Sequence, residues 1–227
     1  MRRALLAAAL AFGVCGQLRA HDVSTTPITW NREISRIFYE RCASCHRPGG
    51  TSFSLMTYVD VQPRAVAIRD AVLSRRMPPW GAVSGFGDFR NNQALTAEQI
   101  ELITDWVQDD TPKGNNPRML PPTPKFGSAE SVVVPPNAVE VRGIVSLKSP
   151  IVLDGLLPDG AADGARILAV RPDGTVEPLL WLYGYSEKYR HAFLLRKPMT
   201  LPAGTIIRGV RPQASVLLLP AASSGTH

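Results

Sequence analysis

The chain has 227 residues, a formal net charge of +6 and 44% hydrophobic residues, enough to bury a core in one large or two small domains. Three arginines and no acidic residue lie in residues 1–20, so the remaining chain carries a charge of only +3. This balance gives no argument for a nucleic-acid partner, and we expect none.

Residues 1–20 have the pattern of a secretory signal peptide. Two arginines precede an apolar run from Ala4 to Val14, and QLRA ends in a small residue before the polar HDVST. An eleven-residue run is too short for a membrane-spanning helix. We therefore expect cleavage near Ala20, no stable membrane span afterwards, and export to the periplasm or otherwise out of the cytoplasm. The alternatives are an uncleaved membrane anchor and a lipoprotein acylated at Cys15, although Val14 is large for the position before an acylated cysteine.

Helical periodicity extends over residues 28–110. Three stretches have apolar residues at three- and four-residue steps, and they predict a small all-α domain over residues 21–112. The first runs directly into Cys42 with Asn31 as its predicted N-cap, and the third begins at a capping box formed by Thr96 and Gln99. The predicted inward-facing residues are Ile34, Ile37, Phe38, Val61, Ala65, Ile68, Val72, Ile100, Ile103, Trp106 and Val107.

A proline-rich connector follows. Residues 109–136 contain seven prolines, which exclude a continuous helix and favour an extended, semi-rigid linker. We place the linker at residues 113–137.

Residues 138–221 alternate short apolar runs with turn residues, including PDG twice and PAG once. The runs are VEVRGIVSL, PIVLDGL, ARILAVR, VEPLLWLYG, RHAFLLR, TIIRGVR and SVLLLP. Seven strands in this span predict a small antiparallel β-sandwich that is jelly-roll-like. The predicted fold class is thus multidomain, all-α followed by all-β.

The segment CASCH, residues 42–46, carries the clearest chemical signal. Its C-x-x-C-H spacing is what covalent haem attachment requires, because each thiol adds to one porphyrin vinyl group and the adjacent histidine can reach the iron. It predicts one covalently attached haem c, with His46 as the proximal ligand. Alternatively, Cys42 and Cys45 form a redox-active or structural disulfide beside an unrelated histidine.

The sixth iron ligand has two candidates. Met77, in RRMPPW, follows a predicted helix, and the two prolines after it stiffen the loop that presents its thioether. Met56, in FSLMTYVD, is the alternative, and it could instead fill the core. Ligation by histidine and methionine would occupy both axial positions, so the iron would pass electrons rather than bind oxygen or peroxide.

Residues 28–126 resemble a class I cytochrome c domain, and more narrowly a bacterial group in which CxSCHRPG, SLMTY, RRMPPW and LTAEQIELITDWV occur in this order. The resemblance implies that Cys42, Cys45 and His46 hold the haem with Met77 as distal ligand. It also implies aromatic side chains around the porphyrin, although core packing explains these equally well. The aromatic residues are Phe38, Trp80 and Trp106.

The β-half resembles the second copper-binding half of the copper type II, ascorbate-dependent monooxygenases. That family has a His-x-His copper pair just before the strand that ARILAVRPDG matches, where this chain has LLPDGAADG. Copper(II) prefers imidazole nitrogens, so we expect the copper site to be lost and no catalytic residues to remain. His191 and Met199 are the remaining copper-type ligands of this half, and a lone histidine is seldom a ligand.

These observations predict an exported monohaem cytochrome that carries single electrons between redox protein partners and is not an enzyme. Its β-domain would serve docking or scaffolding. The alternatives are a copper monooxygenase-like enzyme supplied by its own haem, and a haem-based sensor with an open or labile sixth position.

Overall fold

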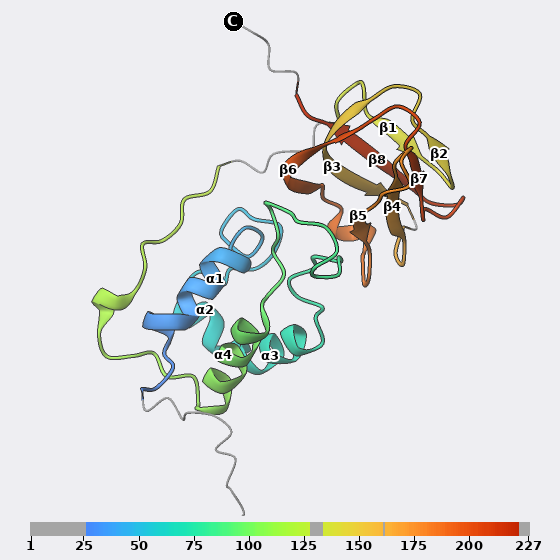
Figure 1. Ribbon diagram of the computed structural model, residues 1–227. Coiled ribbons are helices and arrows are strands. Elements are labelled where there is room, and N and C mark those ends of the chain that lie inside the picture. The colour runs from blue at the N-terminus through green and yellow to red at the C-terminus, as the bar shows by residue number, and fades with distance from the viewer. Residues whose placement is uncertain (1–25, 128–133, 161, 223–227) are drawn as a thin grey trace, which may run out of the picture.

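The computed structural model describes residues 26–127, 134–160 and 162–222. A region with three helical segments is followed by two four-stranded antiparallel sheets that pack as a sandwich, which confirms the predicted fold class (Figure 1). The predicted signal peptide lies outside the described residues. Within them, none of the helices has both the length and the apolar character needed to cross a membrane.

The helical segments match the predicted periodicity. The first comprises η1 (Trp30–Ile34) and α1 (Ser35–Arg41), the second α2 (Tyr58–Val61), η2 (Gln62–Arg64) and α3 (Ala65–Leu73), and the third α4 (Ala97–Gln108). Their apolar faces form one buried cluster, because side chains three and four residues apart share a face of a helix. The cluster consists of Trp30, Ile34, Ile37, Phe38, Leu55, Val61, Ala65, Val72, Leu95, Ile103 and Trp106.

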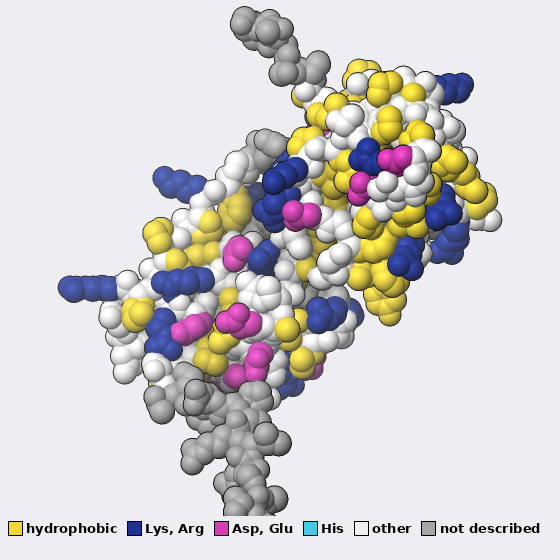
Figure 2. Space-filling view, viewed as in Figure 1, with side chains coloured by type: hydrophobic (Ala, Val, Ile, Leu, Met, Phe, Trp, Pro, Cys, Tyr) yellow, Lys and Arg dark blue, Asp and Glu magenta, His cyan; other side chains and the backbone are white. Residues whose placement is uncertain are grey.

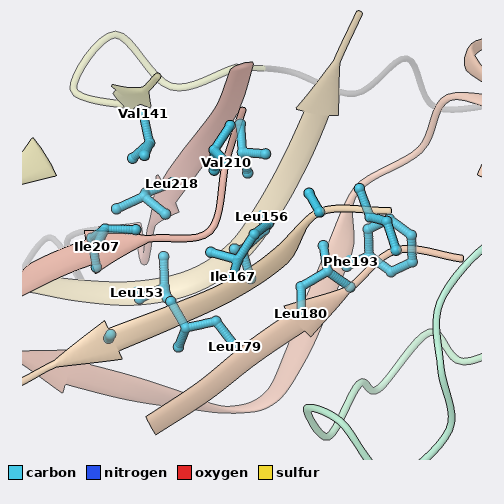
Figure 3. Close-up of a cluster of buried hydrophobic side chains, with 14 of the residues drawn as sticks. Val141, Leu153, Leu156, Ile167, Leu179, Leu180, Phe193, Ile207, Val210 and Leu218 are labelled. Atoms are coloured by element: carbon cyan, nitrogen blue, oxygen red, sulfur yellow. The ribbon is translucent and has the colours of Figure 1, made fainter. Parts of the chain in front are cut away.

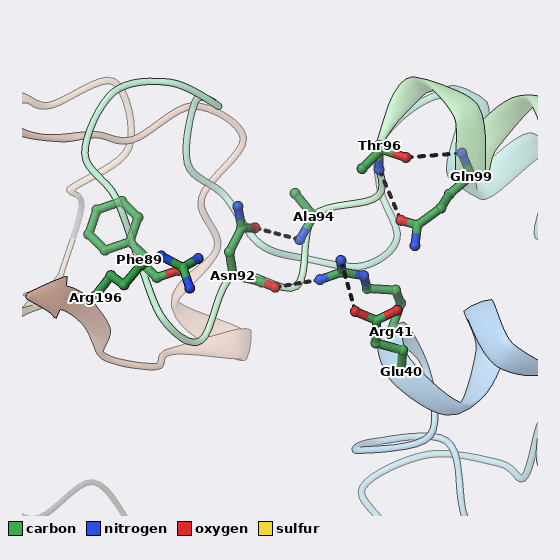
Figure 4. Close-up of polar contacts among 8 residues, drawn as sticks. All are labelled: Glu40, Arg41, Phe89, Asn92, Ala94, Thr96, Gln99 and Arg196. Carbon is green, nitrogen blue, oxygen red and sulfur yellow. Dashed lines mark hydrogen bonds and ion pairs between the residues drawn. The ribbon is translucent and has the colours of Figure 1, made fainter.

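The two predicted helix starts have different outcomes. The capping box is confirmed, since the backbone N–H groups of Thr96 and Gln99 each donate to the other residue's side chain at 3.1 Å (Figure 4). The N-cap at Asn31 is wrong, because the helical segment begins at Trp30 and its N-cap is the extended Thr29, two residues before Asn31. Asn31 is buried instead, and its Nδ2 donates to the carbonyl of Gly114 at 3.2 Å. Its side-chain amide therefore donates to a carbonyl of the linker and does not cap the helix.

The linker follows the helical region before it reaches the sandwich. Residues 112–127 contain one short helix, η3 (Pro117–Met119). The Pro112 carbonyl accepts hydrogen bonds from the backbone of Trp30 and the indole of Trp106, both at 3.0 Å. Further on, the Arg47 guanidinium lies 4.8 Å from the centroid of the Phe126 ring. The linker is thus fixed to the helices at several points.

The sandwich has one more strand than predicted. Its sheets have the orders β1-β8-β3-β6 and β2-β7-β4-β5. The first predicted run is divided between the two sheets, with Gly143 at a φ of 65° between its halves. The first PDG does not form a turn at its proline, because the third strand continues to Asp159. The strands are β1 (Val139–Val141), β2 (Val145–Ser146), β3 (Ile151–Asp159), β4 (Arg166–Val170), β5 (Val176–Trp181), β6 (Phe193–Leu201), β7 (Ile206–Arg208) and β8 (Ser215–Pro220), with the short helix η4 (Glu187–Tyr189) between β5 and β6.

Apolar side chains from both sheets fill the space between them (Figure 3). Leu153, Leu156 and Ile167 are fully buried there. Two residues from the α3–α4 segment (residues 74–96), Trp80 and Phe89, belong to the same cluster. This segment leaves the helices, reaches the sandwich and returns (Figure 1). In the space-filling view, hydrophobic surface gathers over the sandwich, whereas charges of both signs are interspersed over the helical region (Figure 2).

Candidate functional site

The CASCH segment begins where α1 ends. Cys42 is the C-cap of the helix, and its N–H donates to the Phe38 carbonyl at 2.9 Å. The Cys42 carbonyl then accepts from the N–H groups of Cys45 at 3.2 Å and His46 at 2.9 Å, so one further turn brings the motif together. Cys42 and Cys45 are not joined in a disulfide, and Cys42 is partly buried whereas Cys45 is exposed.

A tight loop closes behind the motif. The Ser52 N–H donates to the Cys45 carbonyl at 3.2 Å, and the Leu55 N–H donates to the His46 carbonyl at 3.0 Å. Gly50 makes this closure possible, because a Cβ at that position would lie 2.3 Å from the Cys45 carbonyl oxygen. Gly50 therefore has a steric role directly behind the CASCH segment.

The His46 imidazole is oriented by this loop. Its Nδ1 lies 3.0 Å from the Phe53 carbonyl oxygen, and the Phe53 ring meets it edge-on at 4.8 Å between centroids. A carbonyl oxygen can only accept, so Nδ1 is the donor of this hydrogen bond, and Nε2 is the ring nitrogen left for a metal. A backbone carbonyl in this role is the usual partner of a metal-bound histidine. The donor set and its orientation fit a haem iron.

The electrostatics of Cys42 differ from those of a redox-active cysteine. Burial raises the pKa of its thiol to about 12, with a further increase from Cys45 and an opposing effect of Arg41. Reactive C-x-x-C cysteines have depressed pKa values, commonly at the N-terminus of a helix, whereas Cys42 lies at the C-terminus of α1. The raised pKa and the position at the end of α1 both argue against a redox-active cysteine pair.

The two candidate methionines lie in different settings. Met77 comes four residues after the end of α3, and its N–H donates to the Ala71 carbonyl at 3.2 Å. Its side chain is partly buried, and its peptide bond to Pro78 is cis. Met56 is only 9% exposed, and its carbonyl accepts from the Tyr39 hydroxyl at 3.1 Å. Met56 thus has the environment of a core residue.

The three aromatic residues do not surround one place. Phe38 and Trp106 pack with Trp30 in the helical core, at ring centroid distances of 5.5 and 6.3 Å. Trp80 packs in the sandwich instead, 4.7 Å from Phe193 and stacked on His191 at 5.1 Å. The resemblance implied a place for Trp80 beside the porphyrin, whereas its observed contacts are with the sandwich. No local pattern in the sequence indicates these contacts.

Copper-type ligands in the described part of the β-half lie apart from one another. Among the residues described, no group of three or more His, Cys, Asp and Glu could hold a metal ion. His191 precedes β6, and its Nδ1 lies 2.8 Å from the Tyr189 carbonyl, whereas Met199 lies near the far end of β6 opposite Leu153. These two residues do not form a site.

No family model matches this chain, and neither a curated protein nor a solved structure matches it.

Proposed function

We propose that this protein is an exported monohaem c-type cytochrome that transfers single electrons between redox protein partners. Cys42 and Cys45 would hold one haem c through thioethers, His46 would be the proximal ligand, and Met77 the distal one. The observation that carries this proposal is the CASCH turn with its oriented histidine, whose Nδ1 faces the Phe53 carbonyl at 3.0 Å.

Each part of the site has a separate task. A bound haem supplies one-electron iron chemistry. The two cysteines retain the group, and the Phe53 carbonyl holds the His46 ring and strengthens its donor nitrogen. Met77 would occupy the remaining axial position and exclude water and small ligands. Of the two methionines it is the better candidate, because Met56 is buried in a core-like setting.

The partners are proposed from the chemistry of electron transfer. Such proteins meet in small, transient interfaces, and the mixed charges of the helical surface suit reversible contact (Figure 2). Export to the periplasm rests on the pattern of residues 1–20. The β-sandwich would contribute to docking or scaffolding and not to catalysis.

The decisive experiment is covalent pigment retention. The full chain is produced in a host that attaches c-type haem, denatured, and extracted with acid acetone. We expect the haem to stay on the polypeptide of the wild type and to be lost from the variant carrying Cys42→Ala and Cys45→Ala. Ser44→Ala, between the two cysteines, is the matched control and should keep the haem. A colourless wild-type polypeptide would overturn the proposal.

A further inference from the structure

The α3–α4 segment, residues 74–96, joins the edge of both sheets. Ala82 pairs with Leu182, just after β5, and Phe89 pairs with Leu195 in β6. Strands β5 and β6 are edge strands of their sheets, so the segment pairs at one edge of each sheet. The backbone hydrogen bonds run from Val83 to Trp181 at 2.9 Å, Tyr183 to Gly81 at 3.1 Å, Arg90 to Leu194 at 2.9 Å and Arg196 to Asp88 at 2.9 Å.

Side chains strengthen these pairings. The Arg90 guanidinium binds both carboxylate oxygens of Asp154 in β3 at 2.8 Å, a bidentate geometry that fixes position as well as charge. The Asn91 side chain donates to the Ala192 carbonyl at 2.7 Å and accepts from the Leu194 N–H at 3.0 Å. The segment is therefore bonded to the sandwich, although it lies between two helices in the sequence.

In the sequence, Trp80 is the first residue after Met77 whose side chain packs in the sandwich. It is 6% exposed, and its indole stacks on His191 with an angle of 26° between the rings. The next residue, Gly81, has a φ of 66°, and a Cβ there would lie 2.8 Å from the Cα of Tyr185. This close approach places the backbone directly against the sandwich.

The same segment also reaches α1, the helix that ends just before Cys42. Arg41, the residue before Cys42, donates from Nη1 to the Asn92 carbonyl at 2.6 Å (Figure 4). Near the other end of the segment, the Met77 N–H is bound to the Ala71 carbonyl of α3. Between Met77 and Trp80 lie two prolines, whose rings restrict the backbone. The chain is thus held to α3 through the Met77 N–H and to the sandwich through Trp80, three residues later.

We propose that the β-sandwich is a clamp that holds the loop from Met77 to Trp80, and that Trp80, stacked on His191, is the residue that positions Met77. This inference rests on the proposed function, because it takes Met77 as the iron ligand. A neutral thioether binds iron weakly, so its occupancy depends on how rarely the loop opens. The sandwich lowers the frequency of opening, which gives this domain a role in the haem site without any metal of its own.

The test uses the full-length protein with its haem. Carbon monoxide binds reduced iron only when the sixth ligand leaves, so its binding rate reports loop opening. We expect Trp80→Ala to bind carbon monoxide at least about tenfold faster, which corresponds to about 1.4 kcal/mol, and to weaken the long-wavelength absorption band of a methionine–ferric iron bond. Trp80→Phe keeps an aromatic ring against His191 and should restore both readouts.

Two glycines provide a matched pair of variants. Gly81 and Gly85 both have positive φ values, 66° and 80°, so alanine strains the backbone similarly at each. Only Gly81→Ala collides with the sandwich, because a Cβ at Gly85 meets no atom within 4 Å. Gly81→Ala should speed carbon monoxide binding, and Gly85→Ala should leave the rate unchanged.

Amide hydrogen exchange separates failure of the clamp from failure of the proposed function. The Val83 and Arg90 amides are bonded to the sandwich, and Trp80→Ala should speed their exchange whether or not haem is attached. If the wild type lacks haem or the methionine band, the proposed function or ligand fails while this measurement still tests the clamp. Unchanged exchange and unchanged carbon monoxide binding in Trp80→Ala would overturn the clamp.

Discussion

Replacing Gly50 by alanine tests the loop behind the attachment motif. The added Cβ would lie 2.3 Å from the Cys45 carbonyl oxygen and 3.0 Å from both Cγ and the carbonyl oxygen of Arg47. Two of these three contacts are with backbone, so the loop itself must move. The carbonyl of Cys45 also accepts the hydrogen bond from Ser52, which this movement would disturb.

The expected cost follows from these contacts. Overpacking costs about 1–3 kcal/mol and the loss of one hydrogen bond about 0.5–1.5 kcal/mol, so we expect the free energy of unfolding to fall by about 1.5–4.5 kcal/mol. Urea unfolding of the purified full chain, followed by circular dichroism of the helices, measures this change. Because the movement reaches His46, the absorption spectrum of the attached haem should shift as well.

Gly127→Ala is the control for this prediction. A Cβ at Gly127 meets no atom within 4 Å, and we expect a change within about 0.5 kcal/mol. If Gly50→Ala unfolds within about 1 kcal/mol of the wild type and its haem spectrum is unchanged, the steric account of the loop is wrong.

Four further predictions concern the haem site and the sandwich. Met77→Ala should leave the haem attached but open the sixth position to carbon monoxide, whereas Met56→Ala should keep the visible spectrum and lose about 2–5 kcal/mol of stability on urea unfolding; the opposite pattern would transfer the ligand to Met56. Reduced wild type should bind carbon monoxide slowly, and rapid, complete binding would instead support a haem sensor. Elemental analysis should find no stoichiometric copper, and tightly held copper would favour the monooxygenase-like alternative. Burial lowers the pKa of His191, so the unfolded chain binds a proton at this residue more readily than the folded chain. The free energy of unfolding should therefore decline as the pH falls through about 6.5. His191→Phe should flatten this decline in urea unfolding measured from neutral to mildly acidic pH.

The helices and strands were largely predictable because their signals are local. The spacing of apolar residues fixed the buried face of each helix, and the bonds between Thr96 and Gln99 span only three residues. Asn31 shows the limit of such reasoning. Its side chain has the chemistry of an N-cap, but it is used by a carbonyl of the linker 83 residues away.

The side chains of the candidate site could be proposed from the sequence, whereas the backbone groups that orient them could not. The C-x-x-C-H spacing is a property of five consecutive residues, so Cys42, Cys45 and His46 can be proposed as haem-holding residues from the sequence alone. The group that orients His46 is the carbonyl of Phe53, and every residue has such a carbonyl. Residue type therefore carries no information about this hydrogen bond.

The sequence by itself determined a helical half, a strand-rich half, and the residues that would hold a haem. The tertiary structure alone decided that the segment carrying Met77 is built into the edges of the sandwich. The hydrogen bond from Arg90 to the Leu195 carbonyl joins residues 105 positions apart. Such contacts arise from the packing of whole elements, whereas capping, periodicity and motif spacing act within a few residues of the chain.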